Sequence, residues 1–230
     1  MFDTIAPDYD RLNRWVSLGM DRFWRRRAVA RMPATGWIVD WCAGTGDMTK
    51  EYLRRRGNRG RVVLCDFSAE MRRACESRLS AGERSRCVYV CCDVTRTPFR
   101  DGVFDGQMQG FAIRNLMDRA SFFAEVRRVG RPGNRGALLD LSVPRFAPWR
   151  WICHFHFQVI APRLVALLTK RSVFAYRYLA ESIEHHLDPK DIVDEIRATG
   201  LSDAGHISLA GGIGAIFLWG KGKGEGESCE

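Results

Sequence analysis

Short apolar runs alternate with longer stretches of mixed charged and apolar residues over most of this chain. The longer stretches, such as Ser68–Leu79 and Arg119–Val129, carry their charges at helical spacing. Strands connected through helices run parallel in one sheet, because a parallel connection needs a crossover. The alternation therefore predicts an α/β fold with a doubly wound, mostly parallel sheet. The strand-like runs are Trp37–Trp41, Arg61–Cys65, Cys87–Cys91, Phe104–Gly110 and Ala137–Leu141.

Further elements flank this alternating core. Tyr9–Met32 is predicted to form one or two amphipathic helices. Pro144–His186 breaks the alternation and is too apolar for a linker, so we interpret it as an inserted lid or substrate wall. The predicted C-terminal elements are a helix over Pro189–Thr199, begun by Asp188 and ended by Gly200, and strands at Gly205–Ala210 and Ile213–Trp219.

The chain is predicted to form one domain. Its 230 residues suffice for one large core but are few for two full-sized domains. We divide it into N-terminal helices (1–32), a cofactor-binding core (37–142), a helical lid insertion (144–186), a C-terminal helix with strands (187–220) and a flexible tail (221–230).

The cysteine pattern bears on compartment and metal content. The eight cysteines are scattered, Cys91 and Cys92 are the only adjacent pair, and no zinc-type or disulfide-type spacing occurs. We therefore expect a reduced cytosolic setting and no metal site. The chain opens without a basic stretch and an apolar core of the secretory kind. The longest apolar stretch, Phe146–Leu168, contains charged residues and is not expected to span a membrane.

The net charge of +9 comes mostly from arginine and includes the runs Arg25–Arg27 and Arg54–Arg56. Such a surface could meet a phosphate backbone or an anionic membrane, or simply be a solvated basic face. No N-P-P-[YF]-type catalytic loop follows the fourth strand, and no paired aromatic residues for base stacking stand there. We therefore expect no nucleic-acid partner.

A glycine-containing loop, Asp40–Asp47, leads from the first strand straight into a helix. Gly44 and Gly46 would allow a tight turn and a close approach of a ligand to the backbone. Glycines after a strand are also ordinary turn residues, so this pair alone decides little. The third glycine of the dinucleotide fingerprint is missing. An acidic loop suits a cofactor with a sulfonium and an ammonium better than one with phosphates.

Successive strand ends carry further residues of the kind that hold a ligand. Asp66, about 20 residues beyond the glycines, can accept both hydroxyls of a ribose. It could instead begin the next helix, although Ser68 can do so. Asp93 ends the third strand, and Val94 could offer a backbone amide and an apolar wall to an adenine ring. Gly110 ends the fourth strand and leaves room beside the sheet.

Several separated motifs resemble the ring C-methyltransferases of menaquinone and ubiquinone biosynthesis. The match covers nearly the whole chain, and general methyltransferases lack its two most specific stretches, Phe111–Asn115 and Tyr176–Ile183. The chain departs from the family pattern at Cys42–Ala43, where the family usually has its small residues in another order. It also has Asp140 where the family usually has Glu. The remaining motifs are Phe2–Asp10 with Asn13, Ser17, Asp21 and Trp24, and Arg128–Val129 with Pro132–Gly133, Asp140 and Ser142.

The resemblance implies a seven-stranded, Rossmann-like methyltransferase fold that binds S-adenosyl-L-methionine. It implies methylation of a ring carbon of a demethylated quinol, which must first lose a hydroxyl proton. Asp40 joins the expected cofactor-binding residues because it begins the glycine-containing loop. The expected cofactor-binding residues are Asp40, Gly44, Thr45, Gly46, Asp66, Asp93, Val94 and Gly110.

For the acceptor, Arg114 is our leading catalytic candidate, because a guanidinium near the fourth strand end could stabilise a phenolate. It could alternatively be structural and pair with Asp118 or Glu125. His156 and Tyr176 are further catalytic candidates, although a histidine on an apolar segment is usually a core residue. The expected substrate-binding residues are Asn115 and Arg177.

A lipophilic quinol substrate implies that the protein lies in the cytoplasm, peripherally at the inner face of the cell membrane. The sequence is also compatible with a homodimer. Two rival functions also stay open. One is a methyltransferase of another small lipophilic acceptor. The other is a catalytically weak partner subunit in a quinone-synthesis assembly.

Overall fold

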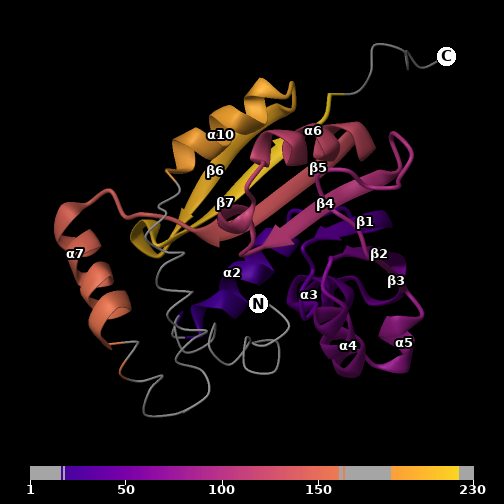
Figure 1. Cartoon of the computed structure of the whole chain (residues 1–230), viewed down its shortest axis with the longest axis horizontal. Coiled ribbons are helices and arrows are strands. Elements are labelled where there is room, and N and C mark those ends of the chain that lie inside the picture. The colour runs from indigo at the N-terminus through magenta and orange to yellow at the C-terminus, as the bar shows by residue number, and fades with distance from the viewer. Residues whose placement is uncertain (1–16, 18, 161–162, 164–187, 223–230) are drawn as a thin grey trace.

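The computed structural model describes residues 17, 19–160, 163 and 188–222. At its centre lies a seven-stranded sheet in the order β3-β2-β1-β4-β5-β7-β6 (Figure 1). All pairs among β1 to β5 are parallel, and β7 is antiparallel to both of its neighbours. The predicted fold class is confirmed. The strands are β1 (Gly36–Trp41), β2 (Gly60–Cys65), β3 (Cys87–Val90), β4 (Phe104–Gly110), β5 (Gly130–Leu141), β6 (Ser202–Leu209) and β7 (Gly214–Gly220).

Several of the helices begin at a residue whose side chain caps them. Ser68, Asp118 and Asp188 each accept a hydrogen bond from a backbone N–H in the first turn of the helix that follows. Asp188 and Ser68 thus take the places that the sequence predicts for them. The helices are α2 (Met20–Val29), α3 (Asp47–Arg56), α4 (Ala69–Arg78), α5 (Ala81–Arg84), α6 (Arg119–Val129), α7 (Ala147–Phe155) and α10 (Pro189–Ala198), and Ile113–Asn115 forms the 3-10 turn η2.

Two apolar clusters, one on each face of the sheet, form the core. On one face, Trp24 of α2 and Tyr52 of α3 pack with β-strand residues such as Leu139. On the other face, Phe122 of α6 and Ile192 of α10 pack with their own set of strand residues. Helices therefore cover both faces, as a doubly wound sheet requires (Figure 1).

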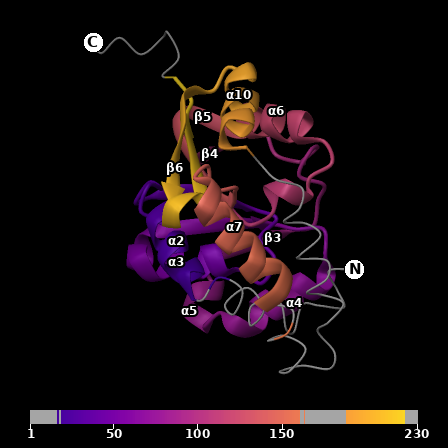
Figure 2. The same ribbon diagram turned by 90° about the vertical axis from the view of Figure 1, so that its left-hand side faces the viewer.

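Helix α7 stands off from the sheet near η4 (Ala210–Gly212), the turn that joins β6 to β7 (Figures 1 and 2). Trp149 donates from Nε1 to the carbonyl of Ala210 at 3.2 Å, and Cys153 is buried, so this side of α7 faces the protein. The helix occupies the start of the predicted lid, and most of the remainder lies outside the described residues. None of the helices described is long and apolar enough to cross a bilayer.

Candidate active site

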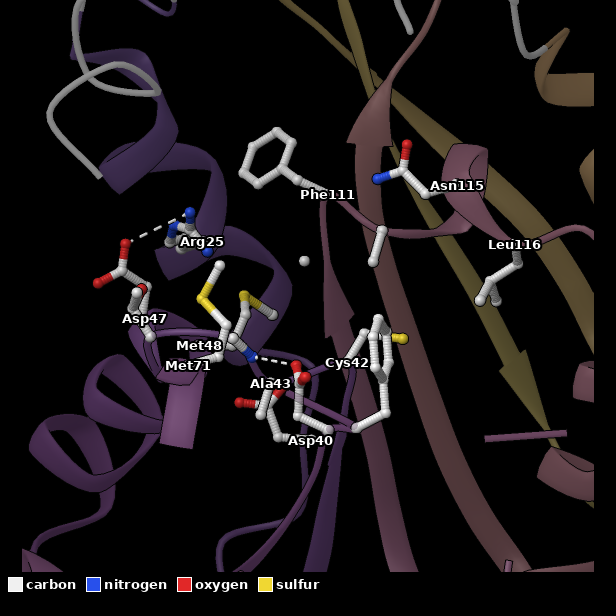
Figure 3. Close-up of a pocket in the computed structure, with 16 residues that line it drawn as sticks. Arg25, Asp40, Cys42, Ala43, Asp47, Met48, Met71, Phe111, Asn115 and Leu116 are labelled. Atoms are coloured by element: carbon white, nitrogen blue, oxygen red, sulfur yellow. Dashed lines mark hydrogen bonds and ion pairs between the residues drawn. The ribbon is translucent and has the colours of Figure 1, made fainter. Parts of the chain in front are cut away.

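A pocket lies beyond the C-terminal ends of β1, β2 and β4, where a doubly wound sheet offers its ligand site. Sixteen residues between Arg25 and Leu116 line it, and Figure 3 shows their side chains around the pocket. Of the predicted cofactor residues, the lining includes Asp40, Gly44, Thr45, Asp66 and Gly110. The substrate candidate Asn115 also lines the pocket.

The loop after β1 takes an unusual backbone path. Cys42, Gly44 and Gly46 all have positive φ, at 50°, 53° and 80°. The space beside Gly44 is open, because a Cβ there would meet no atom closer than 3.9 Å. A Cβ on Gly46 would overlap the Sγ of Cys75. Gly44 therefore leaves room for a ligand, whereas Gly46 allows α4 to pack closely against the loop.

Asp66 ties this loop to the end of β2. One carboxylate oxygen accepts from the N–H of Gly44 at 2.8 Å, and the other accepts from the N–H of Ser68 at 2.9 Å. A carboxylate oxygen can accept more than one hydrogen bond, so these two contacts are compatible with binding of ligand hydroxyls. Asp66 is half-buried at the pocket wall and does not cap α4.

Asp40 lies at the bottom of the pocket with 1% of its surface exposed. One of its oxygens accepts from Thr49, at 2.6 Å from the hydroxyl and 3.1 Å from the backbone N–H. Burial raises the pKa of Asp40 from 3.8 to about 7, while the Thr49 hydrogen bonds and Arg25 oppose the rise. The pocket thus contains a carboxylate that changes protonation near neutral pH.

Asp93 and Val94 are not among the described residues that line the pocket. The Asp93 carboxylate turns back on its own chain and accepts from Thr95, at 2.8 Å from the N–H and 2.7 Å from the hydroxyl. Val94 packs into the core beneath α6. Because β3 ends at Val90, three residues before Asp93, the chain has already turned at this point. Their role in cofactor binding stays a prediction.

Arg114 lies in η2, and its guanidinium forms an ion pair with the fully buried Asp140 of β5. Asp118 and Glu125, the partners that the sequence suggested for a structural Arg114, are wrong. Asp118 accepts from the N–H of Ser121 at 2.9 Å, and Glu125 pairs with Arg128 at 2.6 Å. The Arg114 side chain is 4% exposed and is not among the residues that line the pocket, unlike its neighbour Asn115.

The candidates from the insertion are placed only in part. His156 directly follows α7, is half-buried and does not line the pocket within the part of the chain that the structure describes. Tyr176 and Arg177 lie outside the described residues.

Sequence reasoning missed Arg25, Asp47 and Phe111. The run Arg25–Arg27 suggests an exposed basic face, whether solvated or facing an anionic partner, yet Arg25 is 7% exposed and lines the pocket. Its guanidinium carbon lies 4.9 Å from the centre of the Phe111 ring. Phe111 takes a positive φ of 63°, an uncommon backbone conformation for a bulky residue. The helical position of Arg25, four residues after Asp21 and next to the apolar Trp24, is the signal that could have found it.

The polar groups of the pocket fit S-adenosylmethionine. The described lining has the three carboxylates Asp40, Asp47 and Asp66 and one cation, Arg25. Such a set can hold a ligand with hydroxyl, ammonium and sulfonium groups and a single carboxylate. Open space beside Gly44 allows the ligand to approach the backbone.

Comparisons with known proteins agree with this fit. A model described as the ubiE/COQ5 methyltransferase family matches residues 1–221. A ubiquinone/menaquinone biosynthesis C-methyltransferase of Geotalea daltonii is 35% identical over 94% of this chain and 93% of its own length. One of Coxiella burnetii is 31% identical over 94% and 87%.

Solved structures confirm the fold. A SAM-dependent methyltransferase from Aquifex aeolicus superimposes with a TM-score of 0.59 at 13% identity, over 84% of this chain and 86% of its own. Phosphoethanolamine N-methyltransferase 2 of Haemonchus contortus, in complex with S-adenosyl-L-methionine, has a TM-score of 0.62 at 13% identity and covers 86% and 52%.

Proposed function

The chain belongs to the ubiE/COQ5 methyltransferase family, and from this membership we propose that it methylates a ring carbon of a demethylated quinol in ubiquinone or menaquinone biosynthesis. The methyl donor is S-adenosylmethionine. The observation that carries the proposal is the pocket at the strand ends, whose three carboxylates and one guanidinium match the charges of this cofactor.

When bound, the cofactor supplies an electrophilic methyl group on its sulfonium. The protein must then hold the acceptor carbon in line and exclude water, which are tasks of positioning. Asp66 is suited to hold ribose hydroxyls, because both of its oxygens are already oriented by backbone N–H groups. Met48, Met71 and Phe111 provide apolar walls that keep water away.

Asn115 and Arg114 are proposed to act on the acceptor. Asn115 lines the pocket directly, and the Arg114–Asp140 ion pair fixes the turn that carries it to β5. A ring carbon becomes a nucleophile when an ortho hydroxyl loses its proton, and Arg114 would stabilise the resulting negative charge through this turn or a bridging water. His156, Tyr176 and Arg177 remain candidates for holding the ring.

The quinol rather than the quinone is proposed as the substrate. An oxidised ring is electron-poor and has no hydroxyl to deprotonate, so it cannot attack the methyl group. The test is to incubate the protein with S-adenosylmethionine and a short-tailed demethylated naphthoquinone, with and without a reductant, and to weigh the product. We expect one added methyl group only in the reduced sample. Equal methylation of the oxidised ring would contradict the mechanism.

The same assay addresses the head group and the rival functions. A demethylated benzoquinol is run in parallel with the naphthoquinol, and their rates identify the preferred ring. Cofactor binding without turnover on either ring would instead point to a partner subunit or to a different lipophilic acceptor.

A peripheral position at the inner face of the cell membrane is proposed as well, because the acceptor carries an isoprenoid tail. Trp151, Ile152 and Phe155 of α7 are 67%, 51% and 44% exposed, and the Trp151 and Phe155 rings stack at 5.8 Å. Arg145 precedes this helix and is exposed. Apolar rings beside a cation are suited to the interface of an anionic bilayer.

Flotation with anionic vesicles tests the membrane contact. We expect binding at low salt that weakens at high salt, and loss of binding in the Trp151→Ser/Phe155→Ser protein. Phe23→Ser, which removes a 57% exposed ring from α2, is the matched control. Sedimentation without vesicles examines the homodimer: a dimer that the double variant dissociates would assign this face to a second copy of the chain.

A further inference from the structure

The guanidinium of Arg25 is a buried charge at the wall of the pocket. Arg25 lies in the middle of α2, and only 9% of its side chain is exposed. Arg25 lines the pocket, and Figure 3 shows it next to Asp47, with the Phe111 ring nearby. A Cβ on Gly110 would lie 3.1 Å from its Nη1, so the glycine at the end of β4 leaves room for this guanidinium.

The acidic neighbours of Arg25 compensate its charge only loosely. Nη2 is 3.4 Å from a carboxylate oxygen of Asp47, and Nε is 3.7 Å from one of Asp21. Hydrogen bonds between a guanidinium and a carboxylate are typically about 2.7–2.9 Å long. Nε is buried and has no hydrogen-bond partner among the described residues. Since a buried charge is costly without hydrogen bonds, this geometry points to a ligand that completes the site.

The charges around the pocket indicate what that ligand group is. Among the sixteen described lining residues, Arg25 is the only cation, against Asp40, Asp47 and Asp66. The positive groups of a ligand can therefore choose among three carboxylates, but an anionic group has one charged partner. S-adenosylmethionine has one anionic group, the carboxylate of its methionine part.

We propose that Arg25 binds this carboxylate and so anchors the methionine end of the cofactor. The inference rests on the proposed function, because it names S-adenosylmethionine as the ligand. A guanidinium presents a planar fork of N–H donors that matches a carboxylate in two parallel hydrogen bonds. The Phe111 ring supports one face of the fork, and Asp47 orients it from Nη2 without forming a close hydrogen bond.

The experiment compares ligands with and without the carboxylate by calorimetric titration. The wild-type protein should bind S-adenosylmethionine about 10- to 100-fold more tightly than decarboxylated S-adenosylmethionine. In Arg25→Met, the affinity for S-adenosylmethionine should fall by about the same factor, while that for the decarboxylated ligand changes little. Arg25→Lys should recover only part, because an ammonium lacks the fork.

Arg78→Met is the matched control. Arg78 also pairs with Asp47, at 2.6 Å, but it is not among the residues that line the pocket. Whatever this change does to Asp47, it should affect both ligands alike. The proposal is overturned if Arg25→Met weakens both ligands equally, which would make Arg25 structural.

The test remains decisive if Arg25→Met fails to fold. Equal affinity of the wild-type protein for the two ligands would overturn the proposal without any variant. A wild-type protein that binds neither ligand would overturn the proposed function instead, so the two failures are distinguishable.

Discussion

Asp66 joins two loops through the N–H groups of Gly44 and Ser68. We expect Asp66→Ala to lower the affinity for S-adenosylmethionine by roughly 10- to 150-fold for each charge-assisted hydrogen bond lost. Calorimetric titration measures the effect, and circular dichroism confirms folding. Asp66→Asn is the control, because its amide oxygen can keep one backbone hydrogen bond. Unchanged affinity in a folded Asp66→Ala protein would remove the ribose assignment.

Asp40 should make stability depend on pH. Below about pH 3.8 its carboxyl is protonated in both the folded and the unfolded chain, and above about pH 7 it is ionised in both. Between these values the folded chain holds the proton and the unfolded chain releases it, so the free energy of unfolding falls as pH rises. Asp40→Asn should lose this part of the slope, by a few kcal/mol at most.

Urea denaturation at pH 5 and pH 7.5 measures this difference. The wild-type protein should lose more stability over the interval than Asp40→Asn does. Equal losses in the two proteins would show that the pKa of Asp40 is not raised.

Variants of the Arg114–Asp140 pair can distinguish a structural role of Arg114 from a catalytic one. Arg114→Ala leaves a buried carboxylate unpaired, which costs about 3–5 kcal/mol. If Arg114 also stabilises charge on the acceptor, kcat should fall about 100-fold or more with nearly unchanged cofactor affinity. The double variant Arg114→Met/Asp140→Leu removes both charges and should recover stability but not kcat. Full recovery of kcat would make Arg114 a structural residue.

The site residues that the sequence predicts are those that local patterns reveal, and the ones it misses depend on contacts between residues far apart in the sequence. Asp40, Gly44 and Asp66 stand at strand ends, which local apolar patterns reveal. Asp140 is 26 positions from Arg114, and their contact depends on how β4 and β5 are paired. Arg25 resembles a surface arginine because sequence pattern alone does not show how α2 packs against the sheet.

At the scale of elements, β5 pairs tightly with β7 at a glycine. A Cβ on Gly136 would overlap the indole of Trp219. We therefore expect Gly136→Ala to reduce stability by about 1–3 kcal/mol, as overpacking does. Thermal unfolding measures the loss. Gly205→Ala in β6 is the control, because a Cβ there has open space around it, and an equal loss in both proteins would contradict the steric explanation.

Helix and strand bounds were predictable where the pattern is regular. The predicted bounds of β4 and α6 agree with the structure. By contrast, β5 begins at Gly130 rather than at Ala137. Its first half, which includes Asn134, lacks alternating apolar residues. Asn134 is buried, and two hydrogen bonds compensate its polar amide. Its NH2 group donates to the carbonyl of Phe104 at 3.0 Å, and its oxygen accepts from the Gln107 side chain at 3.2 Å. Sequence alone does not reveal these contacts.

At the scale of the whole molecule, the last strand that the structure describes along the chain is an inner strand of the sheet. β7 lies between β5 and β6 and pairs with both. A ribosome makes the chain from its N-terminus, so β5 must wait with an open edge until Gly214–Gly220 has left the exit tunnel. The pocket residues from Arg25 to Leu116 are synthesised long before that moment. The nascent protein therefore has all the described parts of its cofactor pocket before it can close its sheet, and in that interval it is most exposed to aggregation and to chaperones.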